Sequence, residues 1–401
     1  MSIKLFFCGD IVISEKRNEF ISSEMLELIH DCDLSVCNFE APIKSNGKAI
    51  PKAGPHLFQY EGAIALIKKS GFNVCTLANN HIYDYGDKGL RKTLDVFGES
   101  GLKTIGAGMD FESAYEPLIL TIKEIKIGLI SFCEGEFGSY LKKENRGGYA
   151  YINNVIVNGI VQRTKLQVDF LIIIVHAGVE EVPLPLPEWR ERYRNLCDLG
   201  ADVIIGHHPH VPQGIEEYNK SFIFYSLGNF FMDWGKYRTK SDYGYSVILE
   251  LNSNSINYKI IPHKKKDGNI SICADQKYLS YLKKLNSWLE HDYNILSTQQ
   301  YIYLYYTRYR KYYKIGLNSI DEITNILLNM KSTIQHVLLR KNKSIDKNLL
   351  LLHNIRIDSH RFSMQEALSL LHEKNFHGNY SKFNSIMAET AEFLEDDKTD
   401  E

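Results

Sequence analysis

Residues 203–210 read Val-Ile-Ile-Gly-His-His-Pro-His, an apolar run that passes directly into three histidines. The β-branched run predicts a buried strand, so the histidines follow its carboxyl end. Ligand sites in α/β sheets collect at the carboxyl ends of strands. Two imidazoles that flank a proline at such a place have little structural purpose. This stretch therefore indicates a metal or catalytic site on an α/β sheet.

Four further polar clusters each follow a predicted strand. They are Gly9-Asp10, Asn38-Phe39-Glu40, Asn79-Asn80-His81 with Asp84, and His176-Ala177-Gly178. Each cluster alone has an ordinary explanation: a Gly-Asp pair is usually a turn, and a single histidine after a strand is more often a core residue. Taken jointly, the five clusters make a metal site about ten times more probable than coincidence.

The donor set suits two divalent cations. Mn, Fe or Zn accept mixed carboxylate, amide-oxygen and imidazole ligands. In a two-metal site one carboxylate bridges ions that lie about 3.5–4 Å apart. Glu40 is the candidate bridge, with Asp10 and His210 on one metal and Asn80, His176 and His208 on the other. We expect one or two such ions per chain.

His81 has a separate expected role as a general acid. It follows a candidate ligand, so its ring can face the substrate and protonate a leaving oxygen. Asp84 would hold that imidazole in its proton-donating state. Five more residues are expected to line or buttress the pocket and bind substrate: Asn38, Glu180, His207, Gln213 and Asn229. Capping of strand-end backbone groups explains Glu180, Gln213 and Asn229 equally well.

Residues 1–262 alternate short apolar runs with segments of helical period, the pattern of an α/β domain. We expect strands at 3–8, 34–37, 74–78, 103–105, 125–132, 170–175, 203–205, 222–227, 245–251 and 256–261. Helices are expected at 61–70, 87–100, 155–166 and 188–199, several of them closed by a glycine. The last two strands alternate in a way that suits antiparallel pairing, so a mixed-sheet architecture follows.

Strand signals end after the polar run 263–269, and apolar residues then take helical spacing. Such stripes occur at 278–289, 302–313 and 323–338, and Ser363 with Glu366 has the spacing of a capping box that opens a helix ending before Gly378. We expect a helical C-terminal region at 275–395 and a frayed acidic tail at 396–401.

One part of this helical region, residues 301–314, mixes seven tyrosines with arginines and lysines. Stacking and charge of this kind could bind an anionic polymer or a nucleic acid. Its clean helical period favours a tyrosine stripe packed on a neighbouring helix, with the cations in solvent. The formal charge of −2 also gives no global basic field, so no nucleic-acid partner is expected. The helical region remains a candidate for a protein partner or self-association.

The bulk composition excludes several other classes. The seven cysteines are scattered without a CxxC pair, which indicates a reducing compartment rather than a disulfide framework. No run of eighteen apolar residues and no signal peptide occurs, so no membrane contact is expected and the expected location is cytoplasmic. A GxSxG elbow, a Walker A motif and a Rossmann fingerprint are also absent from the sequence.

The polar clusters and their flanks resemble the CapA family, which is named for poly-γ-glutamate capsule synthesis. The matching stretches follow the family's order within residues 1–262: 38–40, 77–86, 176–180, 200–211 and 225–230. The family is similar to calcineurin-like metallophosphoesterases, which implies a four-layer αββα sandwich of two mixed sheets and a dimetal centre. The resemblance makes the six ligands named above metal-binding positions and makes His81 the acid.

Three positions depart from the related patterns. The first motif, Gly9-Asp10-Ile11-Val12, lacks the histidine of the Asp-x-His pattern, so one metal would have one ligand fewer. Glu40 stands where the wider superfamily uses aspartate, and its longer arm would alter the metal spacing. Many family members carry a membrane anchor before the first strand, whereas this sequence starts at that strand.

Three functions follow as alternatives. The first is metal-dependent hydrolysis, most simply of a phosphoester in a small or polymeric anionic substrate. The second keeps the metals and acts on γ-glutamyl amides. The third is a non-catalytic accessory of capsule or polyglutamate biosynthesis, which would use the helical region as an adaptor.

Overall fold

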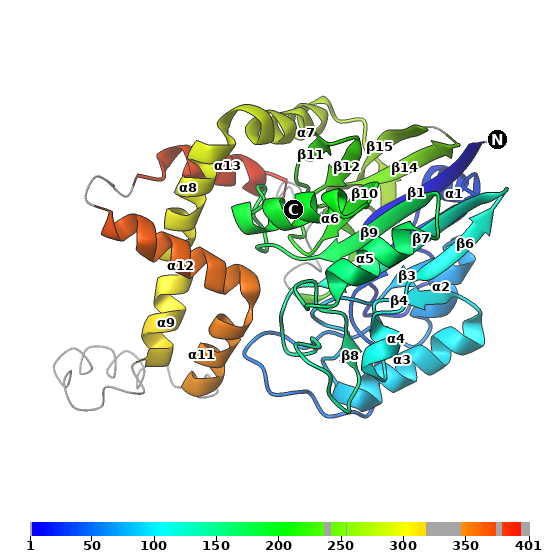
Figure 1. Cartoon of the computed structure of the whole chain (residues 1–401), viewed down its shortest axis with the longest axis horizontal. Coiled ribbons are helices and arrows are strands. Elements are labelled where there is room, and N and C mark those ends of the chain that lie inside the picture. The colour runs from blue at the N-terminus through cyan, green and yellow to red at the C-terminus, as the bar shows by residue number, and fades with distance from the viewer. Residues whose placement is uncertain (1, 236–241, 254, 318–345, 374–378, 394–401) are drawn as a thin grey trace.

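The computed structural model describes residues 2–235, 242–253, 255–317, 346–373 and 379–393, and these form two mixed sheets with helices around them (Figure 1). The first sheet contains β1 (Ser2–Val12), β2 (Leu34–Phe39), β3 (Val74–Thr76), β4 (Lys103–Ile105), β13 (Asn229–Met232), β14 (Gly244–Asn252), β15 (Ser255–Lys266) and β16 (Asn269–Ile272). Its order is β16-β15-β14-β1-β2-β3-β4, and β13 also pairs with β1.

The second sheet has the order β11-β12-β10-β9-β7-β6. Its strands are β6 (Leu118–Ile122), β7 (Ile125–Cys133), β9 (Phe170–His176), β10 (Val203–His207), β11 (Ile215–Tyr218) and β12 (Ser221–Phe224). The four central strands are parallel, and the edge strands β6 and β11 are antiparallel to their neighbours. A small third sheet pairs β5 (Ala107–Gly108) with β8 (Gly148–Tyr149).

The strands separate their apolar residues by face, because successive side chains of a strand point to opposite sides. In β1, Leu5 and Phe7 pack into the core between the two sheets, whereas Phe6 and Cys8 pack outward against helices. In β9, Ile172 and Ile174 face the same inner core. Strands buried on both faces read as continuous apolar runs, which is why their sequence pattern was detectable.

Helices cover the outer face of each sheet. The first sheet carries α1 (Ser23–His30), α2 (Ala63–Lys69) and α3 (Gly86–Ser100), and the second carries α5 (Val157–Lys165) and α6 (Pro187–Asp198), with the short α4 (Phe111–Ala114) nearby. The expected four-layer αββα sandwich of two mixed sheets is confirmed.

The first sheet continues beyond residue 262, where we expected the first domain to end. Strand β15 runs to Lys266 and pairs with β16, with Lys266 opposite Asn269. The polar run 263–269, after which we expected no strands, is the turn end of this hairpin. Its charged side chains lie near the edge of the sheet, where water reaches them.

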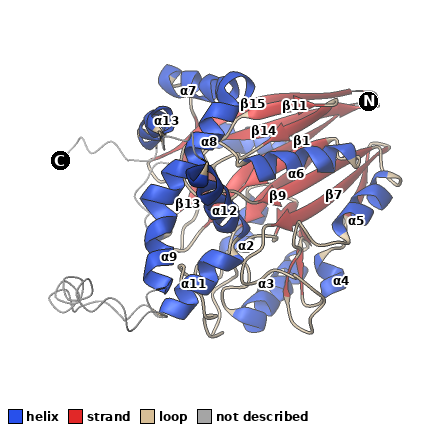
Figure 2. Cartoon of the chain, turned by 60° about the vertical axis from the view of Figure 1, so that its left-hand side comes forward, coloured by secondary structure: helices blue, strands red, loops and turns tan. Residues whose placement is uncertain are grey.

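The C-terminal region is helical, as expected. It contains α7 (Gln276–Ser287), α8 (Tyr293–Leu304), α9 (Arg310–Leu317), α11 (Lys347–Arg356), α12 (Asp358–His372) and α13 (Ser381–Ala391), with π-helical turns at Trp288–Asp292 and Tyr305–Tyr309. Helices α8, α9, α11 and α12 lie together at one end of the sandwich (Figures 1 and 2). Tyr301, Ile302 and Leu304 of α8 pack into the same core as Trp189 of α6. Tyr301 and Tyr309 are therefore buried on the domain, as we favoured, whereas Tyr306 and Tyr312 are exposed. Arg308 is not free in solvent but donates to the carbonyl of Glu180.

Of three further expectations for this region, one is wrong and two fall outside the described residues. The capping box at Ser363 is wrong, because α12 begins at Asp358 and Ser363 is a buried residue inside it that donates to the carbonyl of Ser359. The stripe at 323–338 and the acidic tail at 396–401 lie outside the described residues. None of the described helices is long and apolar enough to cross a membrane.

Candidate metal centre and its pocket

The candidate ligands gather because the carboxyl ends of parallel strands meet at one edge. In the first sheet Asp10 is in register with Asn38 of β2 and Asn229 of β13. In the second sheet His207 is opposite His176. The chain then turns sharply at these ends: Ala41, His208 and His210 have positive φ angles of 102°, 96° and 59°. Non-glycine residues in this conformation are strained and cluster at functional sites.

Asp10, Glu40 and His210 form a first cluster of donors. One ligand atom from each lies within 4.8 Å of the other two, and all three residues are buried. The Nδ1 atom of His210 is 3.4 Å from an Asp10 oxygen, and its Nε2 atom is 3.9 Å from Glu40 Oε1. Two carboxylates and one imidazole therefore converge on one point.

Asn80, His176 and His208 form a second cluster beside the first. The Nε2 atom of His176 lies 3.1 Å from Asn80 Oδ1 and 3.1 Å from His208 Nδ1. The same nitrogen is 3.8 Å from Glu40 Oε1. Glu40 thus faces both clusters, which is the place that a bridging carboxylate would occupy.

The chemistry of these donors fits divalent cations. Neither carboxylate oxygen of Glu40 has a hydrogen-bond partner within the described part of the chain, although the residue is fully buried. Burial without partners is costly for a carboxylate. Burial also raises the pKa of Glu40 well above its usual value. A cation between the clusters would supply the missing counter-charge, so the residues present fit such an ion.

The histidine pKa values fit the same picture. Burial lowers the pKa of His176 well below its usual value and lowers the pKa of His208 to about 4, so both rings are neutral and offer lone pairs. For His210, Glu40 and Asp10 outweigh the effect of burial and raise the pKa to about 10. A proton thus sits on His210 where a cation could displace it, because metal binding and protonation compete for one lone pair.

Four of the five residues expected to bind substrate instead contact the ligands or the backbone. Asn38 Nδ2 donates to Asp10 Oδ1 at 2.7 Å, and His207 Nδ1 lies 3.1 Å from the same oxygen. Asn229 Oδ1 is 3.0 Å from His210 Nδ1. Gln213 donates to the carbonyl of Val182. Residues of this kind orient metal ligands, and only Glu180 of the five lines the pocket described below.

His81 lies beside the second cluster and has two partners for one ring nitrogen. Its Nδ1 atom is 2.7 Å from Asp84 Oδ2 and 3.2 Å from Lys52 Nζ, and Lys52 also pairs with the other oxygen of Asp84. Burial and the Lys52 cation together lower the pKa of His81. Asp84 therefore contacts His81, and its role in keeping the ring protonated stays a prediction. Lys52 lies in a loop that carries no recognisable pattern.

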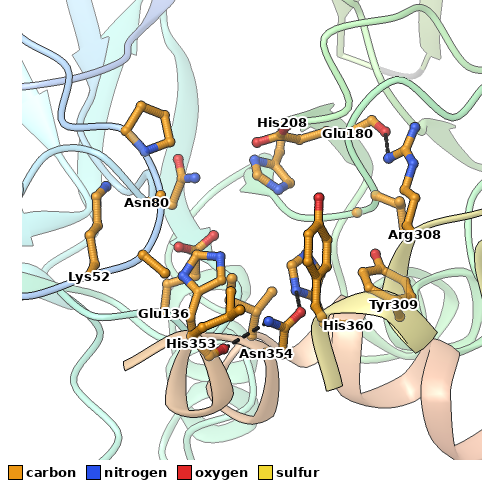
Figure 3. Close-up of a pocket in the computed structure, with 18 of the residues that line it drawn as sticks. Lys52, Asn80, Glu136, Glu180, His208, Arg308, Tyr309, His353, Asn354 and His360 are labelled. Carbon is orange, nitrogen blue, oxygen red and sulfur yellow. Dashed lines mark hydrogen bonds between the residues drawn. The ribbon is translucent and has the colours of Figure 1, made fainter. Parts of the chain in front are cut away.

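A pocket of about 280 Å³ opens beside Asn80, His81 and His208 (Figure 3). On the sandwich side it is lined by Lys52, Glu136 and Glu180. On the other side it is lined by the C-terminal helices, through Arg308, Tyr309, Tyr312, Leu350, His353, Asn354, Ile357 and His360. No sequence pattern predicted this second wall, because its residues come from separate helices and meet only in the folded chain.

Buried hydrogen bonds attach this helical wall to the metal centre. Glu134, which follows β7, accepts from the backbone and hydroxyl of Ser359 in α12. The same carboxylate accepts from the backbone of Gly178 and lies 3.6 Å from His208 Nε2. In return, Asp358 accepts from the backbone of Gly135 at 3.1 Å. The wall is therefore fixed to the same residues that position a candidate ligand.

A family model and two curated proteins match this chain, and all three concern capsule or PGA biosynthesis. The sequence model of a family described as "Bacterial capsule synthesis protein PGA_cap" matches residues 4–234. The capsule biosynthesis protein CapA of Bacillus anthracis is 29% identical over 266 residues, which cover 64% of this chain and 64% of that protein. The PGA biosynthesis protein CapA of Bacillus subtilis is 31% identical over 245 residues, which cover 58% of this chain and 64% of that protein. The chain thus spans less than two thirds of the length of these relatives.

Among solved structures, the match to a putative 5'-nucleotidase from Staphylococcus aureus covers 77% of this chain and 66% of that chain, with 14% identity and a TM-score of 0.44.

Proposed function

The chain belongs to the bacterial capsule synthesis protein PGA_cap family, and from this premise we propose that it is a metal-dependent hydrolase whose simplest substrate is a phosphoester. The observation that carries the proposal is the buried carboxylate of Glu40, which lacks a hydrogen-bond partner in the described part of the chain and faces both donor clusters. A carboxylate in this position has a clear use as a metal bridge and no evident structural one.

The proposed ligands are Asp10 and His210 on one side of Glu40 and Asn80, His176 and His208 on the other. Divalent Mn, Fe or Zn bound there would supply an activated water molecule and would bind the oxygens of the scissile group.

His81 is the proposed general acid. Its Nδ1 atom is occupied by Asp84, so Nε2 can donate a proton to the leaving oxygen only from the doubly protonated ring. Burial and Lys52 disfavour that form, whereas an anionic phosphoester beside the ring would favour it. His81 lines the pocket, which gives it access to a substrate there. In the overall reaction water adds to phosphorus, the ester P–O bond breaks, and the leaving oxygen takes the proton.

Hydrolysis of a γ-glutamyl amide is a second candidate, favoured by the charges of the pocket. Its lining carries both cations and carboxylates, namely Lys52, Arg308, Glu136 and Glu180. Both matched Bacillus relatives are named for capsule or PGA biosynthesis. A substrate made of amino-acid units would present charges of both signs.

One experiment tests the proposal. Purified wild-type protein is assayed for bound metals and for hydrolysis of phosphoesters and γ-glutamyl peptides, in parallel with His208→Ala, His81→Ala and the exposed control His30→Ala. We expect His208→Ala to lose metal and turnover together. His81→Ala should retain metal while turnover falls by about 10²–10⁴-fold, since Lys52 still pairs with Asp84. His30→Ala should behave as wild type.

Other outcomes would contradict the proposal. Stoichiometric metal without turnover on either substrate class would favour a non-catalytic accessory role in capsule or polyglutamate biosynthesis. Absence of any bound transition metal would overturn the assignment of the site itself.

A further inference from the structure

The C-terminal helices contribute polar side chains to the pocket beside the candidate metal centre. Arg308 comes from the π-helical turn before α9, His353 from α11, and His360 from α12. Figure 3 shows His353 and His360 along one side of the pocket, opposite Asn80 and His208. A substrate with its reacting group at the metal centre would therefore have its remaining part against these helices.

This wall is a fixed part of the pocket. Arg308 donates to the carbonyl of Glu180 at 2.6 Å, and Arg356 donates to the carbonyl of Glu136 at 3.0 Å. Together with the Ser359–Glu134 contacts, these bonds hold the helices against the two loops that carry the pocket's carboxylates. Residues held by hydrogen bonds of this kind are preorganised to bind a ligand.

The charges of the pocket are balanced at both ends. Figure 3 places Lys52 and Glu136 toward one end and Arg308 and Glu180 toward the other. Lys52 already pairs with Asp84, and Arg308 lies 3.7 Å from a carboxylate oxygen of Glu181. Among the described side chains, the positive charge at each end of the pocket is therefore matched by nearby carboxylates.

The histidines of the wall are neutral hydrogen-bonding groups. Burial lowers the pKa of His353 to about 4 and the pKa of His360 to about 3. His360 Nδ1 contacts Asn354 Oδ1 at 3.2 Å, whereas His353 Nδ1 has no hydrogen-bond partner in the described part of the chain. A neutral imidazole can both donate and accept, and the His353 ring lines the pocket, where it would lie beside a bound ligand.

We propose that Arg308, His353 and His360 form a substrate subsite that binds an α-amino-acid end group, with its ammonium near Glu180 and its carboxylate near Arg308. This inference rests on the proposed hydrolase and names the part of the substrate that is not hydrolysed. The guanidinium of Arg308 has five donors in a fork that suits a carboxylate. The carboxylate of Glu180 is the matching acceptor for an ammonium group.

The same features disfavour other ligands. A densely anionic group, such as a polyphosphate or a run of free carboxylates, would be repelled by the carboxylate of Glu180. Burial raises the pKa of Glu136 to about 7, so Glu136 adds only part of a negative charge at the other end of the pocket. The volume of about 280 Å³ is small for a ligand site and suits an end group better than the middle of a polymer. The subsite therefore selects the end of an amino-acid chain.

Calorimetric binding to the Mn-loaded 401-residue chain tests this inference. The probes are γ-glutamyl-glutamate, its N-acetyl form, which lacks the ammonium, and inorganic phosphate. We expect N-acetylation to weaken binding about tenfold or more, which corresponds to about 1.4 kcal/mol. Arg308→Met should weaken binding of the unmodified dipeptide to a similar extent while leaving its metal content at the wild-type level.

Two further variants keep the test decisive if Arg308→Met disturbs the fold. His353→Phe keeps the ring that stacks on Phe137 at 5.8 Å but removes its hydrogen-bonding nitrogens, and it should also weaken binding. The control Leu352→Ala alters an exposed position on the same helix and should bind as wild type does.

Equal binding of both dipeptides, equal binding by wild type and His353→Phe, or binding of phosphate alone would each overturn the subsite. The proposed hydrolase activity is tested separately, by metal-dependent turnover of phosphoesters and peptides. Dipeptide binding without turnover would refute the hydrolase and support the subsite. Turnover without dipeptide binding would support the hydrolase and refute the subsite.

Discussion

Ser359 donates two hydrogen bonds to the carboxylate of Glu134, from its backbone nitrogen at 2.8 Å and from its hydroxyl at 3.0 Å. Both residues are fully buried, and they lie 225 positions apart in the chain. Because Glu134 also accepts from Gly178 and lies 3.6 Å from His208, one carboxylate connects the helical region with the candidate metal centre. The helical region therefore lines the same pocket as the candidate metal centre.

Replacing Ser359 with alanine should destabilise the whole chain. The hydroxyl of Ser359 also accepts the indole N–H of buried Trp189 at 2.8 Å, so the variant leaves that donor without its partner. A buried unsatisfied group costs about 1–3 kcal/mol. Urea denaturation should show a loss of this size, and Ser385→Ala on the exposed side of α13 serves as the control. A loss no greater than that of Ser385→Ala would contradict the structural role of the contact.

Substituting Glu40 should preserve or raise the stability of the metal-free protein but reduce the stabilisation that metal binding provides. In metal-free buffer Glu40→Gln should be at least as stable as wild type, because the substitution removes a buried, unpartnered carboxylate. Added Mn²⁺ should stabilise wild type by about 2.7 kcal/mol at a hundredfold excess over its Kd, and should stabilise the variant much less. Thermal unfolding with EDTA and with Mn²⁺ measures both effects, with Glu61→Gln as an exposed control. Equal stabilisation of all three proteins by Mn²⁺ would refute the bridging role.

The strands and the location of the candidate site could be predicted because both depend on local sequence, whereas the four-layer sandwich was expected from the resemblance to the CapA family. Strands β1, β9 and β10 are buried on both faces, so their apolar runs stand out from the surrounding sequence. The carboxyl ends of such strands meet at one edge, which brings His176 close to His208 without further information. Pattern and topology were sufficient for this half of the site.

The rest depends on contacts between distant parts of the chain. Helix α12 begins at Asp358 rather than at Ser363, because Gly135 and Glu134 bind the first residues of the helix. Likewise, Arg308 and His353 belong to helical segments whose hydrophobic period does not predict a pocket. Only the docking of the helices on the sandwich gives these residues a place in the site.

Acid should remove the contribution of Glu216 to stability. Burial alone would raise its pKa, but hydrogen bonds from Arg190, Arg194 and Tyr225 outweigh that effect and lower the pKa to about 2 from an ordinary value of 4.5. A folded-state pKa below the unfolded value stabilises the protein above pH 4.5, and this stability is lost as the pH falls toward 2.

The variant Glu216→Gln tests this account. Allowing for solvent screening, it should cost about 1–2 kcal/mol at pH 7. The difference in urea-unfolding free energy should shrink below pH 4.5, whereas exposed Glu217→Gln should show little effect at any pH. A pH-independent loss for Glu216→Gln would contradict this account.

Two glycine substitutions should change stability in opposite directions and test how strand packing places Asp10. A Cβ atom on Gly9 would lie 1.9 Å from the backbone oxygen of Gly228, so β13 would have to move away from β1. Because Asp10 donates its backbone N–H to that same oxygen, Gly9→Ala should weaken Mn²⁺ binding and cost about 1–3 kcal/mol or more. Gly98 lies in the exposed interior of α3 with nothing within 4 Å, so Gly98→Ala should gain about 0.5–1 kcal/mol and leave metal binding unchanged. Thermal unfolding and Mn²⁺ titration of both variants check the pair. If Gly9→Ala were as stable as wild type and bound Mn²⁺ equally well, the close packing of β1 and β13 would not be what positions the first candidate ligand.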